Sequence, residues 1–217
     1  YLSASPRTGR SSGKRRSSRM DEFQRLQEEM RRCRKCLDAG YPITPRPIFS
    51  GPATARIMVV GQAPGLNETR TGRPFDGPAG RRLFSWLGQA GFAEDEFRRT
   101  QYITAVTKCY PGKKGTRGDR VPTAMERKLC APFLTRELEL VDPALIIPVG
   151  RIAISRFLGK VRLDEAIGHI YERNGKLFLP LPHPSGANLW LNRPENLTLL
   201  DHAIASLRRI GCHALAF

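Results

Sequence analysis

Residues 55–61 read ARIMVVG, a short apolar run that ends in glycine. A continuous apolar run of this length is typical of a strand that is buried on both faces. Residues 61–80 read GQAPGLNETRTGRPFDGPAG, and their many glycines and prolines predict a rigid loop. Apolar residues then recur at helical spacing through residues 83–90, with Gly91 as a plausible stop. The stretch therefore predicts a strand, a loop and a helix, which is one unit of an α/β fold.

The same alternation continues along the chain. Further strands are predicted at residues 101–106, 144–150 and 176–181. Helices are predicted at residues 20–36, 122–140, 151–158 and 194–210, the second of them opened by a Thr-x-x-Glu capping box. Strands that alternate with helices form parallel sheets covered on both faces, so we expect a three-layer αβα fold around a central parallel four-stranded sheet.

The chain of 217 residues suggests one folded domain, residues 20–217, behind a basic arm. The arm, residues 1–19, carries six basic side chains, no acidic ones, and many serines, which is the composition of a disordered segment. Its apolar content is too low for a secretory signal, although a basic targeting peptide stays open.

The formal net charge is +16, and most of it lies beyond the arm. Such an excess favours a polyanionic partner, and DNA or RNA is the simplest choice. A charge that only serves solubility is the alternative. No run of about 18 apolar residues occurs, so the sequence predicts no contact with a membrane. We expect a monomer.

Five cysteines without a secretion signal favour a reducing compartment, the cytoplasm in the first place. Cys33 and Cys36 form a C-x2-C pair. Cys109 lies in the loop after the second predicted strand, and Cys130 lies on the predicted helix that follows this loop. Four thiolates suit zinc and an iron-sulfur cluster equally well. Cys212 falls outside this pattern, and we expect it to be a free thiol.

Three loops follow the carboxyl ends of predicted strands, where α/β folds bind their ligands. They read GQAPG (61–65), TKCYPG (107–112) and HPSG (183–186). In the last loop His183 lies between two prolines that stiffen the turn, so its ring is held in one place. Taken alone, such a histidine is more often a hydrogen-bonded loop residue than a catalyst.

The order of these motifs, with GRPFDGPAG (72–80) after the first and four cysteines around them, resembles the uracil-DNA glycosylase superfamily. The likeness covers roughly residues 30 to 210. The front of the chain resembles the iron-sulfur family 4, and HPSGAN (183–188) resembles family 5. The resemblance implies a monofunctional glycosylase that hydrolyses the bond between a deaminated base, uracil in the first place, and DNA. It also implies a 4Fe-4S cluster on Cys33, Cys36, Cys109 and Cys130.

The resemblance further implies roles for single residues. His183 and Gln62 are the expected catalytic pair: the imidazole contacts the pyrimidine O2 as the bond breaks, and the amide contacts the base or positions water. Phe75 is the ring on which the extruded base stacks. The substrate site is completed by Ala63, Ala105 and Asn188. Contacts with DNA are expected from Ser185, Lys108 and Leu189, the last as a wedge together with Trp190.

Ala63 stands where family 1 has a water-activating aspartate, a carboxylate that family 4 also lacks. A departure from family 4 weakens part of this reading, because Ala105 replaces the asparagine that reads uracil there. The chain could therefore prefer another deaminated base such as hypoxanthine or xanthine. It could also bind DNA with weak or lost catalysis, or be a redox protein. No lysine lies in a motif that would make it a Schiff-base nucleophile, which argues against a lyase.

Overall fold

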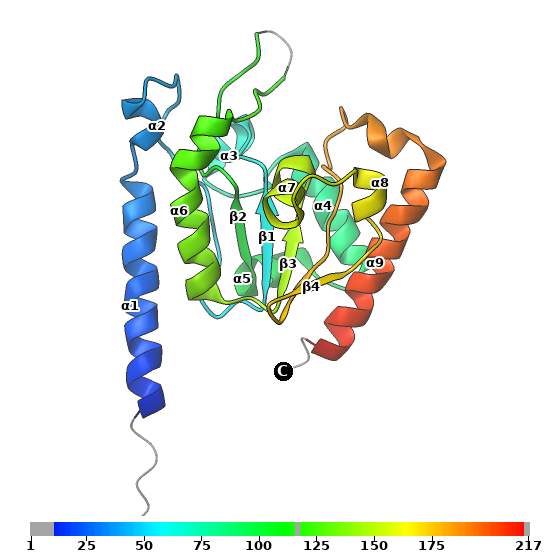
Figure 1. Ribbon diagram of the computed structural model, residues 1–217, viewed down its shortest axis with the longest axis horizontal. Helices are drawn as coiled ribbons and strands as arrows, with labels where there is room; N and C mark the ends of the chain where they lie inside the picture. Colours follow the sequence, from blue (N-terminus) through cyan, green and yellow to red (C-terminus); the bar gives the residue numbers. More distant parts are fainter. Residues whose placement is uncertain (1–10, 116–117, 215–217) are drawn as a thin grey trace, which may run out of the picture.

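The computed structural model describes residues 11–115 and 118–214. Within them lies one five-stranded sheet in the order β2-β1-β3-β5-β4. Four strands run parallel: β1 (Ile57–Gly61), β2 (Tyr102–Ala105), β3 (Leu145–Pro148) and β5 (Lys176–Phe178). These are the four predicted strands, so the parallel core of the fold is confirmed. Their carboxyl ends point to the top of Figure 1.

The fifth strand, β4 (Tyr171–Arg173), pairs antiparallel with β5 and was not predicted. Asn174 and Gly175 join the two strands with φ angles of 52° and 70°. Two positive φ angles in a two-residue loop are the requirement of a type I′ turn, for which Asn-Gly is the preferred pair. The sequence NG before KLF is therefore the signal that could have revealed this hairpin.

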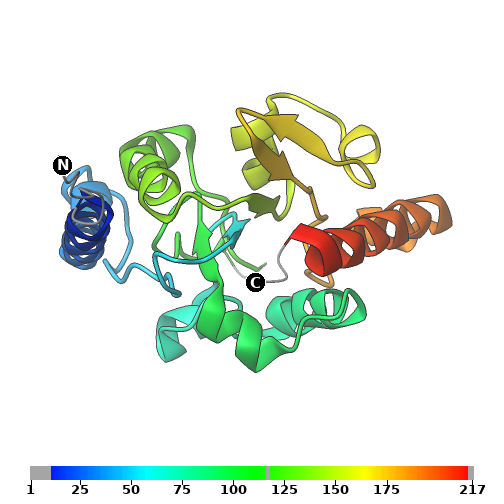
Figure 2. The ribbon, with the colours of Figure 1, turned by 90° about the horizontal axis from the view of Figure 1, so that it is seen from below.

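Helices cover both faces of the sheet, as Figure 2 shows. One face carries α4 (Pro78–Gln89), α5 (Glu94–Thr100) and α9 (Pro194–Ala214); the other carries α1 (Ser11–Arg31) and α6 (Ala124–Val141). Alternate strand residues point to opposite faces, so Ile57 and Val59 pack with the first group while Met58 and Val60 pack with the second. The expected three layers are present.

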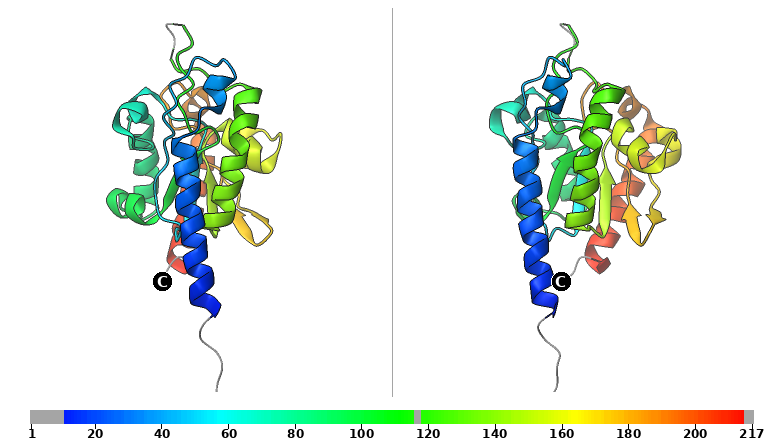
Figure 3. Two further views of the ribbon diagram at one scale, coloured as in Figure 1. Left: turned by 90° about the vertical axis from the view of Figure 1, so that its left-hand side faces the viewer. Right: turned by 60° about the vertical axis from the view of Figure 1, so that its left-hand side comes forward.

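Helix α1 begins at Ser11, nine residues before the predicted start, so residues 11–19 of the expected disordered arm are helical. The helix lies along α6 (Figures 1 and 3) and buries Phe23, Leu26 and Met30. The Arg19 guanidinium donates to the Leu140 carbonyl at 2.8 Å, near the end of α6. A helix end presents free carbonyls and a negative dipole, which explains why a basic residue extends the ordered segment. Residues 1–10 lie outside the described part.

The remaining helices are short and flank the loops. They are α2 (Lys35–Asp38), α3 (Leu66–Thr71), α7 (Arg151–Leu158), α8 (Leu163–Ala166) and the 3₁₀ turn η1 (Leu189–Asn192). The predicted helix at residues 20–36 is thus divided between α1 and α2. Helix α6 has the predicted capping box, with Glu126 N–H donating to Thr123 Oγ1 at 3.2 Å and Thr123 N–H donating to Glu126. Across the described residues, no helix combines the length and apolarity needed to span a bilayer.

Candidate active site and four-cysteine cavity

A hollow of about 280 Å³ opens where β1 and β2 end. Ala63, Phe75 and Ala105, three of the predicted substrate residues, line it together. Its other lining residues are Ile48, Gly61, Pro64, Glu68, Pro74 and Thr104. The walls are mostly apolar, and the carboxylate of Glu68 is the acidic group among them. Sequence analysis missed Glu68, which also caps α3 by accepting from the Gly65 N–H at 3.1 Å.

Two glycines hold the ring of Phe75 in this hollow. A Cβ at Gly61 would lie 3.0 Å from Phe75 Cζ, so the ring rests against the bare end of β1. A Cβ at Gly80 would lie 1.7 Å from the Phe75 carbonyl oxygen, so only glycine lets α4 begin there. Phe75 itself has a φ of 52°, in the left-handed region that bulky residues avoid. The surrounding chain therefore imposes this conformation.

His183 lies at the end of the neighbouring strand pair. Its ring carbons approach to 3.1 Å from where a Cβ of Gly150 would be, so glycine makes room for the imidazole. The residue before Gly150, Val149, donates its N–H to the Val60 carbonyl at 2.9 Å. Gly150 in turn donates to the Leu181 carbonyl at 2.9 Å. These bonds place the His183 loop beside the end of β1, the strand that opens the hollow.

The protonation state of His183 follows from its surroundings. Its Nδ1 accepts a hydrogen bond from the Ser185 N–H at 3.3 Å. Burial lowers the pKa of the imidazole, so the ring is neutral at neutral pH. A neutral imidazole whose Nδ1 accepts must carry its proton on Nε2. His183 is therefore a fixed, uncharged hydrogen-bond donor.

Asn188 supports this loop. Its Nδ2 donates to the His183 carbonyl at 2.8 Å, and its Oδ1 accepts from the Trp190 N–H at 3.2 Å. Both ends of the amide thus make hydrogen bonds inside the loop, and direct substrate contact by Asn188 stays a prediction. Gln62 is half-buried, and its carbonyl accepts from Thr107 N–H at 3.2 Å, which ties the loops after β1 and β2 together.

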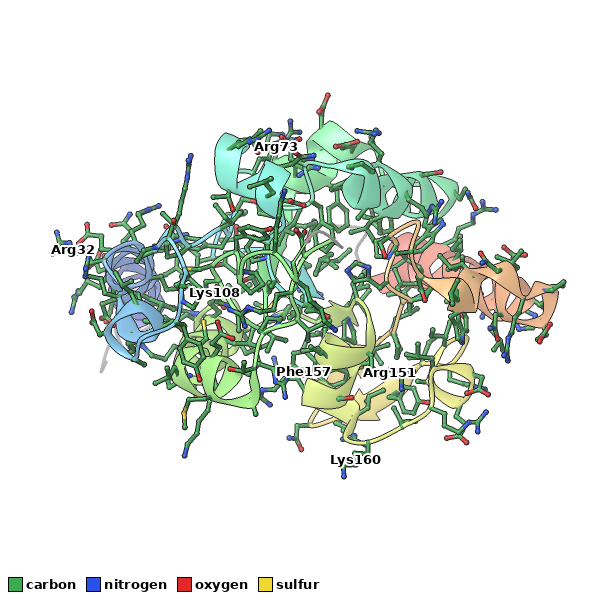
Figure 4. The ribbon with its side chains drawn as sticks, turned by 90° about the horizontal axis from the view of Figure 1, so that it is seen from above. Arg32, Arg73, Lys108, Arg151, Phe157 and Lys160 are labelled. Atoms are coloured by element: carbon green, nitrogen blue, oxygen red, sulfur yellow. The ribbon has the colours of Figure 1, made fainter. Side chains whose placement is uncertain are left out.

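The prediction that Lys108 binds DNA is wrong. The residue is 2% exposed, and its ammonium lies in the interior under the loop after β2. Nζ donates to Thr104 Oγ1 at 2.8 Å and to the Ala105 carbonyl at 2.6 Å, and it pairs with Glu137 Oε2 at 2.5 Å. Three N–H groups with three partners leave no proton for a phosphate. Figure 4 shows Lys108 inside the ring of helices.

Glu137, on α6, completes this buried network. Its Oε1 accepts from Tyr102 O–H at 2.9 Å and from Thr104 O–H at 3.0 Å. Burial, together with the neighbouring carboxylate, raises the pKa of Tyr102 well above its usual value. The network joins β2 to α6, since Tyr102 and Thr104 come from the strand. Because Thr104 also lines the hollow, the buried ion pair of Lys108 and Glu137 supports this wall of the hollow.

The rim of this end of the molecule is basic. Leu189 is 75% exposed, whereas its neighbour Trp190 is half-buried against the core, so the expected wedge pair is split between surface and interior. Both line a groove of about 840 Å³ together with Arg151, Arg162 and Arg193. Arg151 and Arg73 lie on opposite sides of this end in Figure 4. Ser185 is half-buried beside His183.

A second cavity, of about 510 Å³, contains all four predicted cysteines. Cys33 and Cys36 come from the segment around α2, Cys109 from the loop after β2, and Cys130 from α6. Burial raises the pKa of Cys36 to about 11 and that of Cys109 to about 12, and it also raises the pKa of Cys130. The side chain of Cys212 lies outside the described residues.

The donor set of this cavity is four thiols, which as thiolates are ligands of zinc and of iron-sulfur clusters alike. In the described ranges, no three Cys, His, Asp or Glu side chains are close enough together to hold one metal ion. The backbone N–H of Lys108 donates to Cys130 Sγ at 3.4 Å, the kind of contact that tunes cluster sulfurs.

Comparison with known proteins gives a consistent result. The profile of the uracil DNA glycosylase superfamily matches residues 48–208. A type-4 uracil-DNA glycosylase of Archaeoglobus fulgidus is 35% identical over 201 residues, which are 88% of this chain and 93% of that protein. One from Sulfurisphaera tokodaii is 29% identical over 204 residues, 88% and 86% of the two chains. A type-5 enzyme of Pyrobaculum aerophilum is 29% identical over 211 residues, 91% and 89%.

Proposed function

The chain belongs to the uracil DNA glycosylase superfamily, and we propose that it hydrolyses the N-glycosidic bond of uracil in DNA. The observation that carries this proposal is the neutral, immobilised His183 on a loop that backbone hydrogen bonds tie to β1, the strand whose end opens the hollow that holds Phe75. A fixed donor beside an aromatic-lined hollow is what cleavage of an extruded base requires. Each step below follows from these residues.

The base first has to leave the DNA stack. Extrusion costs a few kcal/mol, and stacking on an aromatic ring returns about 1–3 kcal/mol per base. Phe75 offers that ring inside the hollow, against Gly61. Leu189, exposed at the rim, is placed to fill the space that the base leaves behind. Arginines in the groove that Leu189 lines, Arg151 among them, supply charge for the flanking phosphates.

Bond cleavage then moves electrons onto the departing base. As the bond stretches, negative charge grows on the pyrimidine O2 and positive charge on the sugar. The Nε2–H of His183 can donate to that oxygen without reorientation, because Asn188, Ser185 and Gly150 hold the loop and ring. One preorganised donor of this kind contributes about 2.7–4 kcal/mol to the transition state.

Water completes the reaction by adding to the sugar carbon. Ala63 cannot activate water, so the water relies on the electrophilic character of the oxocarbenium-like sugar. We assign the positioning of this water to Gln62, which is half-buried in the loop after β1. The uracil leaves as an anion that the His183 Nε2–H stabilises by a hydrogen bond, and the proton released by the water neutralises this anion by way of solvent. Loss of a general base is therefore compatible with hydrolysis.

We also propose that Cys33, Cys36, Cys109 and Cys130 hold a 4Fe-4S cluster. When bound, the cluster supplies a structural cross-link rather than chemistry at the sugar. It would join the segment around α2 to the loop after β2 and to α6. Anaerobically purified protein should contain about four iron atoms per chain and absorb near about 400 nm. Cys109→Ser should lose the absorbance and Cys212→Ser should keep it, whereas zinc bound without iron would contradict the proposal.

A second substrate is favoured by one observation. Ala105 lines the hollow at the position where family 4 carries its base-reading amide. The smaller side chain and the missing amide make room for a deaminated purine, hypoxanthine or xanthine, beside uracil. The same feature would account for a DNA-binding protein with weak catalysis.

A lesion panel separates these functions. Single-stranded and duplex oligonucleotides that contain uracil, hypoxanthine or xanthine are incubated with excess protein, and abasic sites are revealed by alkaline cleavage. We expect the fastest release from uracil. Faster release of a purine would assign the second substrate. Intact binding without any abasic site, in protein whose iron content is complete, would contradict a glycosylase.

A further inference from the structure

We propose that Arg98 is a positioning residue that fixes the stacking ring of Phe75 through the backbone. This inference rests on the proposed function for its catalytic meaning, but the geometry it predicts can be tested without activity. Arg98 lies on α5, outside the hollow and 23 residues along the chain from Phe75. Nothing in the local sequence, EDEFRRT, marks it for a role at the site.

The guanidinium of Arg98 donates hydrogen bonds to two consecutive backbone carbonyls in the loop that carries Phe75. Nη1 donates to the Pro74 carbonyl at 2.7 Å, and Nη2 donates to the Phe75 carbonyl at 2.9 Å. Arginine presents parallel N–H groups in a rigid fork, so the two bonds fix the orientation of the peptide as well as its position. A lysine in the same place could not hold both oxygens in this way.

The guanidinium is itself held from two other sides. Its Nε donates to Glu94 Oε1 at 2.8 Å, and its plane lies 4.0 Å from the centroid of the Phe84 ring. The side chain is only 9% exposed, so solvent does not compete for these contacts. An exposed arginine samples many rotamers, whereas these contacts hold the Arg98 side chain in one rotamer.

Phe75 needs such a clamp because its backbone is unfavourable. Its φ of 52° is uncommon for a bulky residue and persists only where neighbours impose it. The carbonyl of Phe75 lies between the bare Cα of Gly80 and the Arg98 fork, and this pair sets the direction of the peptide. The direction of the peptide in turn sends the ring against Gly61.

A general stabilising role for Arg98 makes different predictions from a role that acts through Phe75. If Arg98 only stabilises the fold, its replacement lowers the melting temperature and leaves folded enzyme with normal turnover. If it positions the ring, its replacement lowers kcat for folded enzyme and leaves KM for DNA nearly unchanged, because the phosphate contacts come from other residues.

The test combines a structure with a double-mutant cycle. We expect a crystal structure of Arg98→Gln to show Phe75 out of the left-handed region and its ring displaced from Gly61. We expect kcat on a uracil oligonucleotide to fall roughly tenfold, within the roughly 5- to 150-fold range that complete loss of stacking allows. In a Phe75→Leu background the same change should cost less than about twofold, since the ring is already gone.

Controls keep the outcomes separate. Arg99→Gln alters an exposed neighbour on the same helix, which pairs with Glu96 at 3.7 Å, and should leave kcat unchanged. Arg98→Lys keeps the charge and serves if the glutamine variant does not fold; it should fall between wild type and Arg98→Gln. An unchanged Phe75 conformation in the variant structure, or an equal loss of kcat in both backgrounds, overturns the inference. A wild-type enzyme that releases no base refutes the proposed function, while the structure of the variant still decides the geometry.

Discussion

The hollow at the end of β1 and the four-cysteine cavity lie on either side of the loop after β2, and they are built in opposite ways. The chain holds the hollow and its neighbouring loop by itself: glycines, the Arg98 fork and the Asn188 amide fix Phe75 and the loop of His183. The cavity instead contains four thiols, three of which have a pKa raised by burial. The hollow is thus suited to a substrate that binds and leaves, whereas the cavity presents the thiols that the proposed cluster would need.

The buried Lys108 network joins these two regions, and disrupting it should have the largest effect. Removing one partner of a buried ion pair costs about 3–5 kcal/mol, so Lys108→Met should lower Tm by roughly 6–20 °C. Thermal unfolding followed by circular dichroism measures this. The double variant Lys108→Met with Glu137→Met should recover at least half of the loss, because no charge is then left unpaired. A single variant as stable as wild type would show that the two regions are independent.

Replacing His183 should affect the hollow alone. His183→Ala removes the fixed Nε2–H donor, and single-turnover base release should slow about 10²–10³-fold. Absorbance near about 400 nm and iron content should stay at the wild-type level, because the cavity lies elsewhere. His202→Ala, an exposed histidine on α9, is the matched control and should react at the wild-type rate. Loss of iron in His183→Ala would mean that the two regions cannot be separated.

Removing the exposed side chain at the rim should give a smaller effect that depends on the substrate. In Leu189→Ala no side chain fills the gap left by an extruded base, so release from duplex DNA should slow roughly tenfold, a part of the few kcal/mol of unstacking. Single-stranded substrates leave no such gap and should react normally. Leu197→Ala removes another exposed leucine, on α9, and controls for general loss of surface apolarity. An equal loss on both substrates would argue against a wedge.

The smallest expected effect is that of mild acid. Burial lowers the pKa of His183 below 6.5, so the ring stays neutral as the pH falls from 8 to 6.5. Base release should therefore fall by less than about twofold in this range, the loss that an unshifted histidine would show at its midpoint. Below pH 6.5 the rate should drop, because protonated Nδ1 can no longer accept from Ser185 N–H. A rate that rises on acidification would require a charged imidazole.

Local patterns in the sequence were sufficient for much of this architecture. The four parallel strands are continuous apolar runs because both of their faces are covered, and the Thr123 capping box marks the start of α6. Strand β4 escaped notice because two of its three residues are exposed, so it carries no apolar run. The start of α1 was misplaced because Arg19 is held by the end of α6, a contact that composition cannot reveal.

Site residues could be predicted where they lie in recognisable loop motifs, but not where their role depends on contacts with distant segments. The residues that line the hollow come from loops with recognisable motifs, and Ala63, Phe75 and Ala105 do meet there. Lys108 was misread because a lysine in a basic loop resembles a phosphate contact. Its partner gives the only sequence clue: Glu137 lies on the buried stripe of α6 with Phe133 and Leu134, four and three residues away. Arg98 acts through backbone carbonyls, which any sequence provides, so no motif could mark it.

The wide separation of the four cysteines along the chain has a consequence for biosynthesis. About 90 residues separate Cys36 from Cys130, and at about 5–20 residues per second a ribosome needs roughly 5–20 s to make them. During that interval the amino-terminal thiols have emerged while helix α6, which supplies both the last sulfur and the surface for α1, does not yet exist. The cluster proposed above could therefore be completed only after α6 is made, and until then the first two thiols of the nascent chain are exposed to oxidation.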